Sequence, residues 1–76
     1  MWIYLEYAGE IYNLDKFESI EIVDLSTDNS DSFAVVGVRS RGNWTTFAFA
    51  DSEDKAEDIV SEIATSIDNG EKIIYI

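Results

Sequence analysis

Apolar and polar residues alternate with a period near two through the first fifty residues of the chain. Aromatic and β-branched residues dominate this part and short polar segments interrupt it, which predicts a series of β-strands. The expected strands cover residues 2–7, 11–14, 20–25, 33–40 and 44–50, with turns at 8–10, 15–17 and 41–43 and a loop at 26–32. Strands 33–40 and 44–50 are expected to pair as an antiparallel hairpin, because only the turn-forming Arg41-Gly42-Asn43 separates them.

The hydrophobic period changes to about 3.6 after residue 50. One apolar stripe at helical spacing is formed by Ala56, Ile59, Val60, Ile63, Ala64 and Ile67. Asp51 or Ser52 can cap the start of this helix, and Asn69-Gly70 can end it. We therefore expect a helix of about 16 residues, followed by a last short strand at residues 72–76.

These elements predict a single domain, residues 1–76, of the α+β class. We expect a mostly antiparallel, curved sheet of five to six strands, with one α-helix in the C-terminal half of the chain packed on one face. Alternation divides the strand residues between two faces. The helix-facing set is Val36, Val38, Phe47 and Phe49, and the opposite set is Phe33, Val35, Trp44 and Thr46. Since one helix cannot cover both faces, either the sheet curls and buries both sets, which we favour, or a partner covers the second.

The charge balance adds a strong constraint, because 16 Asp and Glu oppose five Lys and Arg, giving a net charge of −11. Such a chain repels nucleic acid and anionic membranes, so we expect direct binding to neither. A hydrophobic content of 46% separates it from disordered acidic tails. No apolar run reaches the roughly 18 residues of a membrane span and no basic leader is visible, so we expect a cytoplasmic protein.

Signatures of catalysis or metal binding are missing. The absence of His and Cys removes the usual base for a Ser nucleophile and the usual zinc ligands. Carboxylate pairs are abundant, but a domain of this size has little volume for a walled cleft. One loop holds Asp24, Asp28, Asn29 and Asp31, yet it lacks the central Gly and final Glu of a calcium loop. We therefore expect a protein that is not an enzyme, with no catalytic residue, cofactor or metal.

Acidic residues concentrate on the expected helix, where like charges stand one turn apart. The candidates for partner contact there are Glu53, Asp54, Glu57, Asp58 and Glu62. Each like-charged i, i+4 pair destabilises a helix by roughly 0.2–0.5 kcal/mol. Two interpretations stay open. The acid excess can serve solubility alone, or carboxylates about 5–6 Å apart can imitate the phosphates of a nucleic-acid strand and occupy the basic groove of a larger nucleic-acid-binding protein.

The chain has one basic spot, where Arg39 and Arg41 flank the hairpin turn beside Trp44. Arg and Trp are favoured interface anchors, so these three residues are further candidates for partner contact. The alternative is an Arg that stacks on Trp44. A second hypothesis for the whole chain is self-association as a homodimer, through an apolar sheet surface formed by Trp2, Tyr4, Phe33, Val35 and Trp44.

Two segments resemble those of small bacterial and phage proteins. Residues 11–22, with Asn13-Leu14-Asp15 at their centre, resemble a strand–turn–strand unit of these proteins, and residues 49–57 resemble their junction between strand and helix. The resemblance covers under half of the chain and implies strands followed by a covering helix, with no site residue to carry over. In size and acidity the chain is also similar, as a class, to phage-encoded inhibitors of bacterial immunity, which implies an inhibitor that acts as a DNA mimic.

Overall fold

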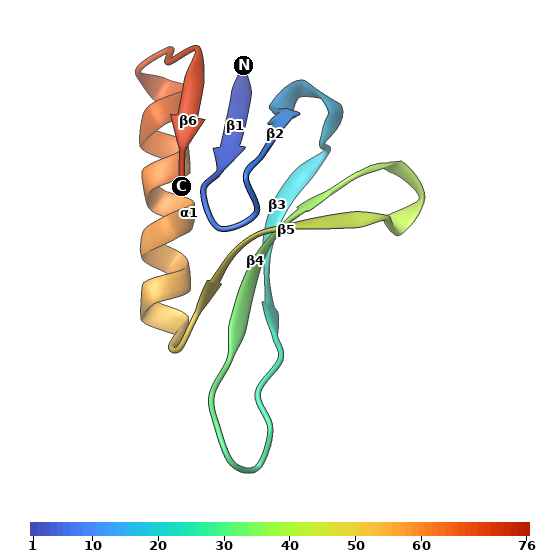
Figure 1. Cartoon of the computed structure of the whole chain (residues 1–76), viewed down its shortest axis with the longest axis vertical. Helices are drawn as coiled ribbons and strands as arrows, with labels where there is room; N and C mark the ends of the chain where they lie inside the picture. Colours follow the sequence, from blue (N-terminus) through green and yellow to red (C-terminus); the bar gives the residue numbers. More distant parts are fainter.

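The computed structural model describes all 76 residues and has the predicted order of strands and helix (Figure 1). The strands are β1 (Trp2–Leu5), β2 (Glu10–Asn13), β3 (Ser19–Asp24), β4 (Phe33–Val38), β5 (Trp44–Ala50) and β6 (Ile73–Tyr75), and the helix is α1 (Glu53–Asp68). Two 3₁₀ turns follow β2 and β4, at Leu14–Lys16 and Ser40–Gly42. The α+β class is confirmed, and the predicted strand ends differ from the observed ones by two residues at most.

The six strands form two three-stranded sheets, so the prediction of one curved sheet of five to six strands is wrong. In the β1 sheet, the central β1 pairs antiparallel with β2 and parallel with β6. In the β4 sheet, the central β4 pairs antiparallel with β3 and β5. The sheets separate at the turn Leu14–Lys16, where the Asn13 side chain accepts a hydrogen bond from the Asp15 amide at 3.1 Å. The chain changes direction there, and β3 pairs with β4 instead of β2.

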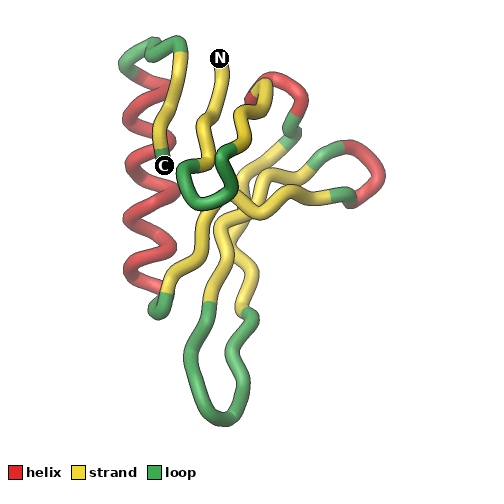
Figure 2. The backbone as a smooth tube through the Cα atoms, viewed as in Figure 1, coloured by secondary structure: helices red, strands yellow, loops and turns green.

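The helix begins and ends as predicted. The Ser52 hydroxyl accepts a hydrogen bond from the Lys55 amide at 3.2 Å, and Glu53 and Asp54 stand in the first turn, beside the positive end of the helix dipole. Gly70 adopts a φ of +69°, and its amide bonds to the carbonyl of Ile67. Figure 2 shows α1 along one side of the strands, with the β3–β4 loop and the tip of the β4–β5 hairpin projecting away from it. No helix has the length and apolar character needed to cross a membrane.

Both sheets and the helix contribute to one hydrophobic core. Its buried members are Ile3, Leu5, Leu14, Val35, Phe47, Ala56, Ile63 and Ile74. The rings of Phe17 and Phe47 meet edge to face within it, with centroids 5.1 Å apart. Only 11 of the 76 residues are buried, so much of the apolar surface stays partly exposed.

A β-bulge between β4 and β5 changes which residues face the helix. Val35 pairs with Ala48, but Val36 pairs with Thr46, which leaves Phe47 as the extra residue on β5. Phe47 therefore turns to the same side as Val35, and both lie in the core. Strict alternation cannot anticipate this shift of one residue.

The predicted faces are corrected accordingly. Of the helix-facing set only Phe47 belongs to the core cluster beneath the helix. Val36 is also buried, at 1% exposed, but Val36 and Val38 pair with Thr46 and Trp44 on the outer face, and Phe49 is 59% exposed. Of the opposite set, Val35 lies in the core and Phe33 packs against it. The remaining two members of that set, Trp44 and Thr46, lie on the outer face as predicted.

Candidate functional site

All five predicted acidic residues of α1 are exposed: Glu53, Asp54, Glu57, Asp58 and Glu62. The structure has two ion pairs, one between Lys55 and Asp51 at 2.9 Å and one between the Met1 ammonium and Asp15 at 3.5 Å. Neither pair includes any of the five acidic residues. Lys55 is the only base on α1, and its hydrogen bond and charge hold the pKa of Asp51 below its ordinary value. The five carboxylates are therefore left without a neutralising side chain.

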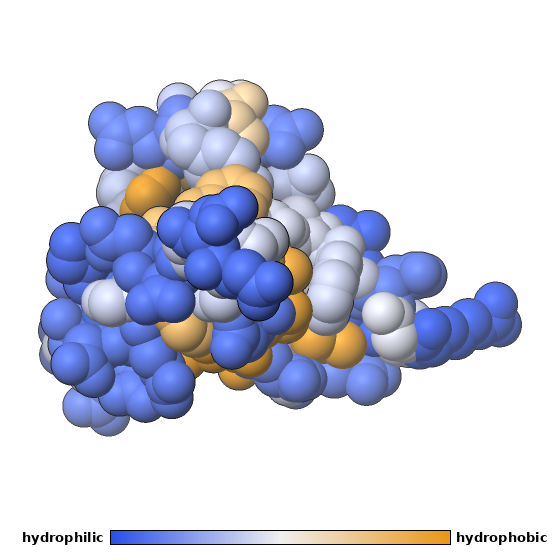
Figure 3. Space-filling view, turned by 90° about the horizontal axis from the view of Figure 1, so that it is seen from below, coloured by the Kyte–Doolittle hydropathy of each residue, from blue (hydrophilic) through white to orange (hydrophobic).

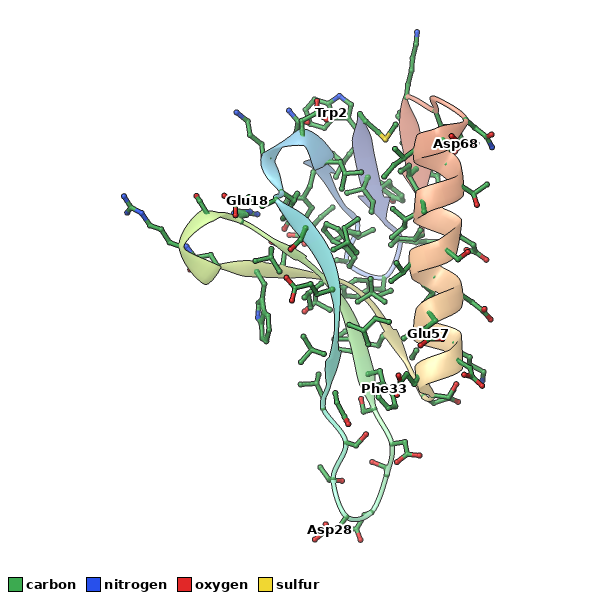
Figure 4. All side chains as sticks on the ribbon, turned by 180° about the vertical axis from the view of Figure 1, so that it is seen from behind. Trp2, Glu18, Asp28, Phe33, Glu57 and Asp68 are labelled. Atoms are coloured by element: carbon green, nitrogen blue, oxygen red, sulfur yellow. The ribbon has the colours of Figure 1, made fainter.

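The acidic residues occupy two rows on the helix. At about 100° per residue, Asp54, Asp58 and Glu62 follow one another on the side away from the buried Ala56. Glu53 and Glu57 form a second row nearer the core, so together the rows span about half of the circumference. We call these five residues the acidic surface. Figure 4 shows the carboxylates of α1 extending from the helix along its length.

The end of the molecule at which α1 begins is hydrophilic. Figure 3 looks at this end and shows a mostly hydrophilic surface, with hydrophobic atoms in several separate patches. Asp24, in the polar β3–β4 region, accepts a hydrogen bond from the Ser26 amide at 2.8 Å, and its hydrogen bonds with Ser26 lower the pKa of this carboxyl. No three acidic side chains are arranged to hold a metal ion.

The predicted basic spot divides into separate parts. The Arg39 guanidinium carbon lies 5.0 Å from the ring centre of Phe17 and 5.7 Å from that of Tyr12, and Nη2 donates to Thr45 Oγ1 at 2.9 Å. Trp44 lies on the opposite face of the hairpin and is 56% exposed. The predicted stacking of an Arg on Trp44 is therefore wrong for Arg39, which is held by other rings.

Arg41 lies at the hairpin tip in a left-handed conformation, with a φ of 69°. Figures 1 and 2 show that this tip projects away from α1. The structure therefore does not bring the predicted contact residues together. The acidic surface is one location, while Arg39, Arg41 and Trp44 belong to another.

The outer face of the β1 sheet is a further exposed surface that the sequence showed only in part. Paired residues place six side chains on it in two rows: Trp2, Asn13 and Ile73 in one, and Tyr4, Ile11 and Tyr75 in the other. Four of them are strongly exposed: Trp2 at 46%, Ile11 at 50%, Ile73 at 37% and Tyr75 at 71%. The rings of Tyr4 and Tyr75 are 5.8 Å apart. We call these six residues the aromatic face.

The predicted apolar interface is corrected by this arrangement. Trp2 and Tyr4 do share a face, but Phe33 and Val35 pack beneath the helix and Trp44 belongs to the other sheet. The prediction missed the parallel pairing of β1 with β6, which brings the two ends of the sequence together. Alternation within each short strand marks an outer face, but not which strands share it.

A shallow hollow of about 510 Å³ lies between α1 and β3. Its walls are mostly apolar, with Ile20 on the strand side and Val60, Ala64 and Ile67 on the helix side, and Asp15 and Glu18 stand among its lining residues.

No protein-family model matches this chain, and comparison with curated proteins and with solved structures found no significant match. The resemblance to small bacterial and phage proteins therefore stays a prediction.

Proposed function

We propose that this chain is a small binding protein without catalytic activity, which places the acidic surface of α1 in the basic groove of a larger, nucleic-acid-binding protein. The observation that supports this proposal is the set of five exposed carboxylates on one helix, none of which forms an ion pair. By occupying a groove built for phosphates, the chain would act as an inhibitor that competes with nucleic acid.

The distribution of charge supports a contact surface more than a general excess of acid. Asp54 repels Asp58, Asp58 repels Glu62, and each such pair costs a helix roughly 0.2–0.5 kcal/mol. Lys residues at alternate positions would have kept the helix hydrophilic and stabilised it. A partner that supplies Lys and Arg side chains removes this repulsion on binding and gains from charge complementarity.

Affinity capture with matched variants tests the proposal. The wild-type chain is immobilised beside Asp54→Lys/Asp58→Lys and a control, Glu10→Lys/Asp28→Lys, in which each reversal also adds two charges. Glu10 lies on β2, and Asp28 lies at the tip of the β3–β4 loop, away from α1 (Figure 4). Proteins captured from a bacterial lysate are identified by mass spectrometry and challenged with duplex DNA and with salt.

We expect the wild-type chain and the control to retain nucleic-acid-binding proteins that DNA and high salt displace, because both disrupt a phosphate-like contact. The α1 variant should lose them by about 100-fold in affinity, since two attractive contacts become repulsive. Equal loss in both variants would show that net charge alone matters. Captured proteins that DNA does not displace would contradict the proposed mimicry.

A further inference from the structure

The aromatic face carries no charged side chain. Its six side chains are two Tyr, two Ile, one Trp and one Asn. Trp and Tyr are the residues most enriched in the centres of protein interfaces. The largest apolar patch on a typical monomer covers about 300–600 Å² and is often functional.

The net charge of −11 restricts what can cover this face. Two copies of the chain repel each other wherever their carboxylates approach. Contact through the aromatic face brings together neutral residues, and the acidic surface of α1 stays on a different side, because both surfaces point away from the common core. The aromatic face is therefore where a second copy can approach with no charged side chain in the central contact.

The exposed area is close to what a specific contact needs. A full aromatic side chain offers about 150–250 Å², so the exposed parts of these side chains amount to roughly 450 Å² per copy. Two copies bury roughly 900 Å² from them alone, near the about 1,000 Å² that separates specific interfaces from chance contacts. Rim side chains add to this area. Dimer formation would also add buried apolar area to a chain whose own core is small, because few residues of a single copy are buried.

We infer that the aromatic face is the contact between two copies of this chain, which pack their β1 sheets face to face in a symmetric homodimer. Sheets stack in this way about 10 Å apart, with aromatic and β-branched side chains interdigitating. The contact does not depend on the proposed binding of a basic partner. The two also respond to salt in opposite ways: screening reduces the repulsion between two acidic copies, whereas it weakens the attraction of a basic partner.

Sedimentation equilibrium of the wild-type chain tests this inference, from micromolar to millimolar concentration, in low salt and in about 1 M NaCl, where the Debye length is about 3 Å. We expect a reversible change from 8.6 kDa to twice that mass, with a lower dissociation constant in high salt. Ile11→Thr/Tyr75→Thr should weaken the dimer by about 100-fold, because it truncates two central contacts. The control Trp44→Thr/Phe49→Thr removes side chains of similar exposure from the β4 sheet and should leave the dimer intact.

Amide chemical shifts of the wild-type chain give a second readout that needs no variant. On dilution, the shifts at residues 2–4, 11–13 and 73–75 should change more than those of α1. A chain that stays at 8.6 kDa under all these conditions overturns the inference. So does a dimer that Ile11→Thr/Tyr75→Thr leaves intact, or one whose concentration-dependent shifts lie outside the aromatic face.

Discussion

Gly37, in the middle of β4, is predicted to be the position at which the smallest substitution is most costly. A Cβ atom built on Gly37 would lie 2.7 Å from Cδ1 of Phe17 and 2.8 Å from Cε2 of Phe47, and it would approach Cζ of Phe47 even more closely. Phe47 is fully buried, and its ring already packs against that of Phe17, so neither ring can move aside without disturbing the core. Since Gly37 does not have a positive φ, alanine is disfavoured there by packing and not by backbone conformation.

The magnitude for Gly37→Ala follows from two opposing terms. Overpacking a core costs about 1–3 kcal/mol, while replacing glycine lowers the entropy of the unfolded chain and returns about 0.4–1 kcal/mol. We expect a net loss of about 1–2 kcal/mol. For a domain of this size, that loss lowers the melting temperature by about 5–15 °C.

Urea and thermal unfolding followed by circular dichroism measure this loss, and a double-mutant cycle tests its cause. Leucine at position 47 lacks the outer ring atoms that block the new methyl group, so Gly37→Ala should cost much less in a Phe47→Leu background. The expected coupling energy is about 1 kcal/mol or more. A Gly37→Ala variant as stable as the wild type, or a cost unchanged by Phe47→Leu, would refute this reasoning.

Three further changes test the helix and its charges. Ser52→Ala removes the N-cap and should lower the free energy of unfolding by about 1 kcal/mol, whereas Ser61→Ala on the exposed side of α1 should change it little, as measured by urea unfolding. Asp58→Lys turns two repulsive i, i+4 pairs into attractive ones and should raise stability by about 1 kcal/mol at low salt; a gain that persists in about 1 M NaCl would contradict an electrostatic origin. Lys55→Gln should return the pKa of Asp51 toward 3.8 in an NMR titration. Because the folded-state pKa of Asp51 is lowered, its contribution to stability is present above the unfolded pKa and is lost as pH falls through the folded one, and this loss should be absent in Lys55→Gln.

Local signals in the sequence were sufficient to predict most of the secondary structure. The tight turn between β4 and β5 fixed their hairpin, and Ser52 and Gly70 fixed both ends of α1. Each of these features depends on residues within a few positions of one another. The change of hydrophobic period after residue 50 marked the helix for the same reason.

The arrangement of the strands could not be predicted from such signals. The parallel pairing of β1 with β6 joins Trp2 to Ile73, across nearly the whole chain, and β6 has only three residues with which to show a pattern. The bulge at Val35 and Val36 moved Phe47 to the core side without any glycine to mark it. Alternation assigns faces correctly only while the register is regular.

The sequence was sufficient to predict which acidic residues of the candidate site are exposed, but not how the other candidate residues are arranged in space. Exposure of the acidic residues on α1 follows from helical spacing, since the opposite stripe is apolar. The position of Arg39 does not, because the rings of Phe17 and Tyr12 come from parts of the chain that only the tertiary fold brings to it. The aromatic face was hidden for the same reason, as its rows combine three strands.

The two proposed contacts use different parts of the chain and are compatible in one molecule. The acidic surface belongs to α1 alone, while the aromatic face belongs to the β1 sheet, and the core residues Ala56 and Ile74 separate them. A dimer built through the aromatic face would leave both acidic surfaces free and present them as a pair. Two linked contacts raise the effective concentration of the second one, so a dimer would hold a symmetric basic partner more tightly than one copy does. At low salt, the repulsion between the two acidic copies would limit this gain in affinity. A basic partner that neutralises α1 would reduce the repulsion and so favour the dimer.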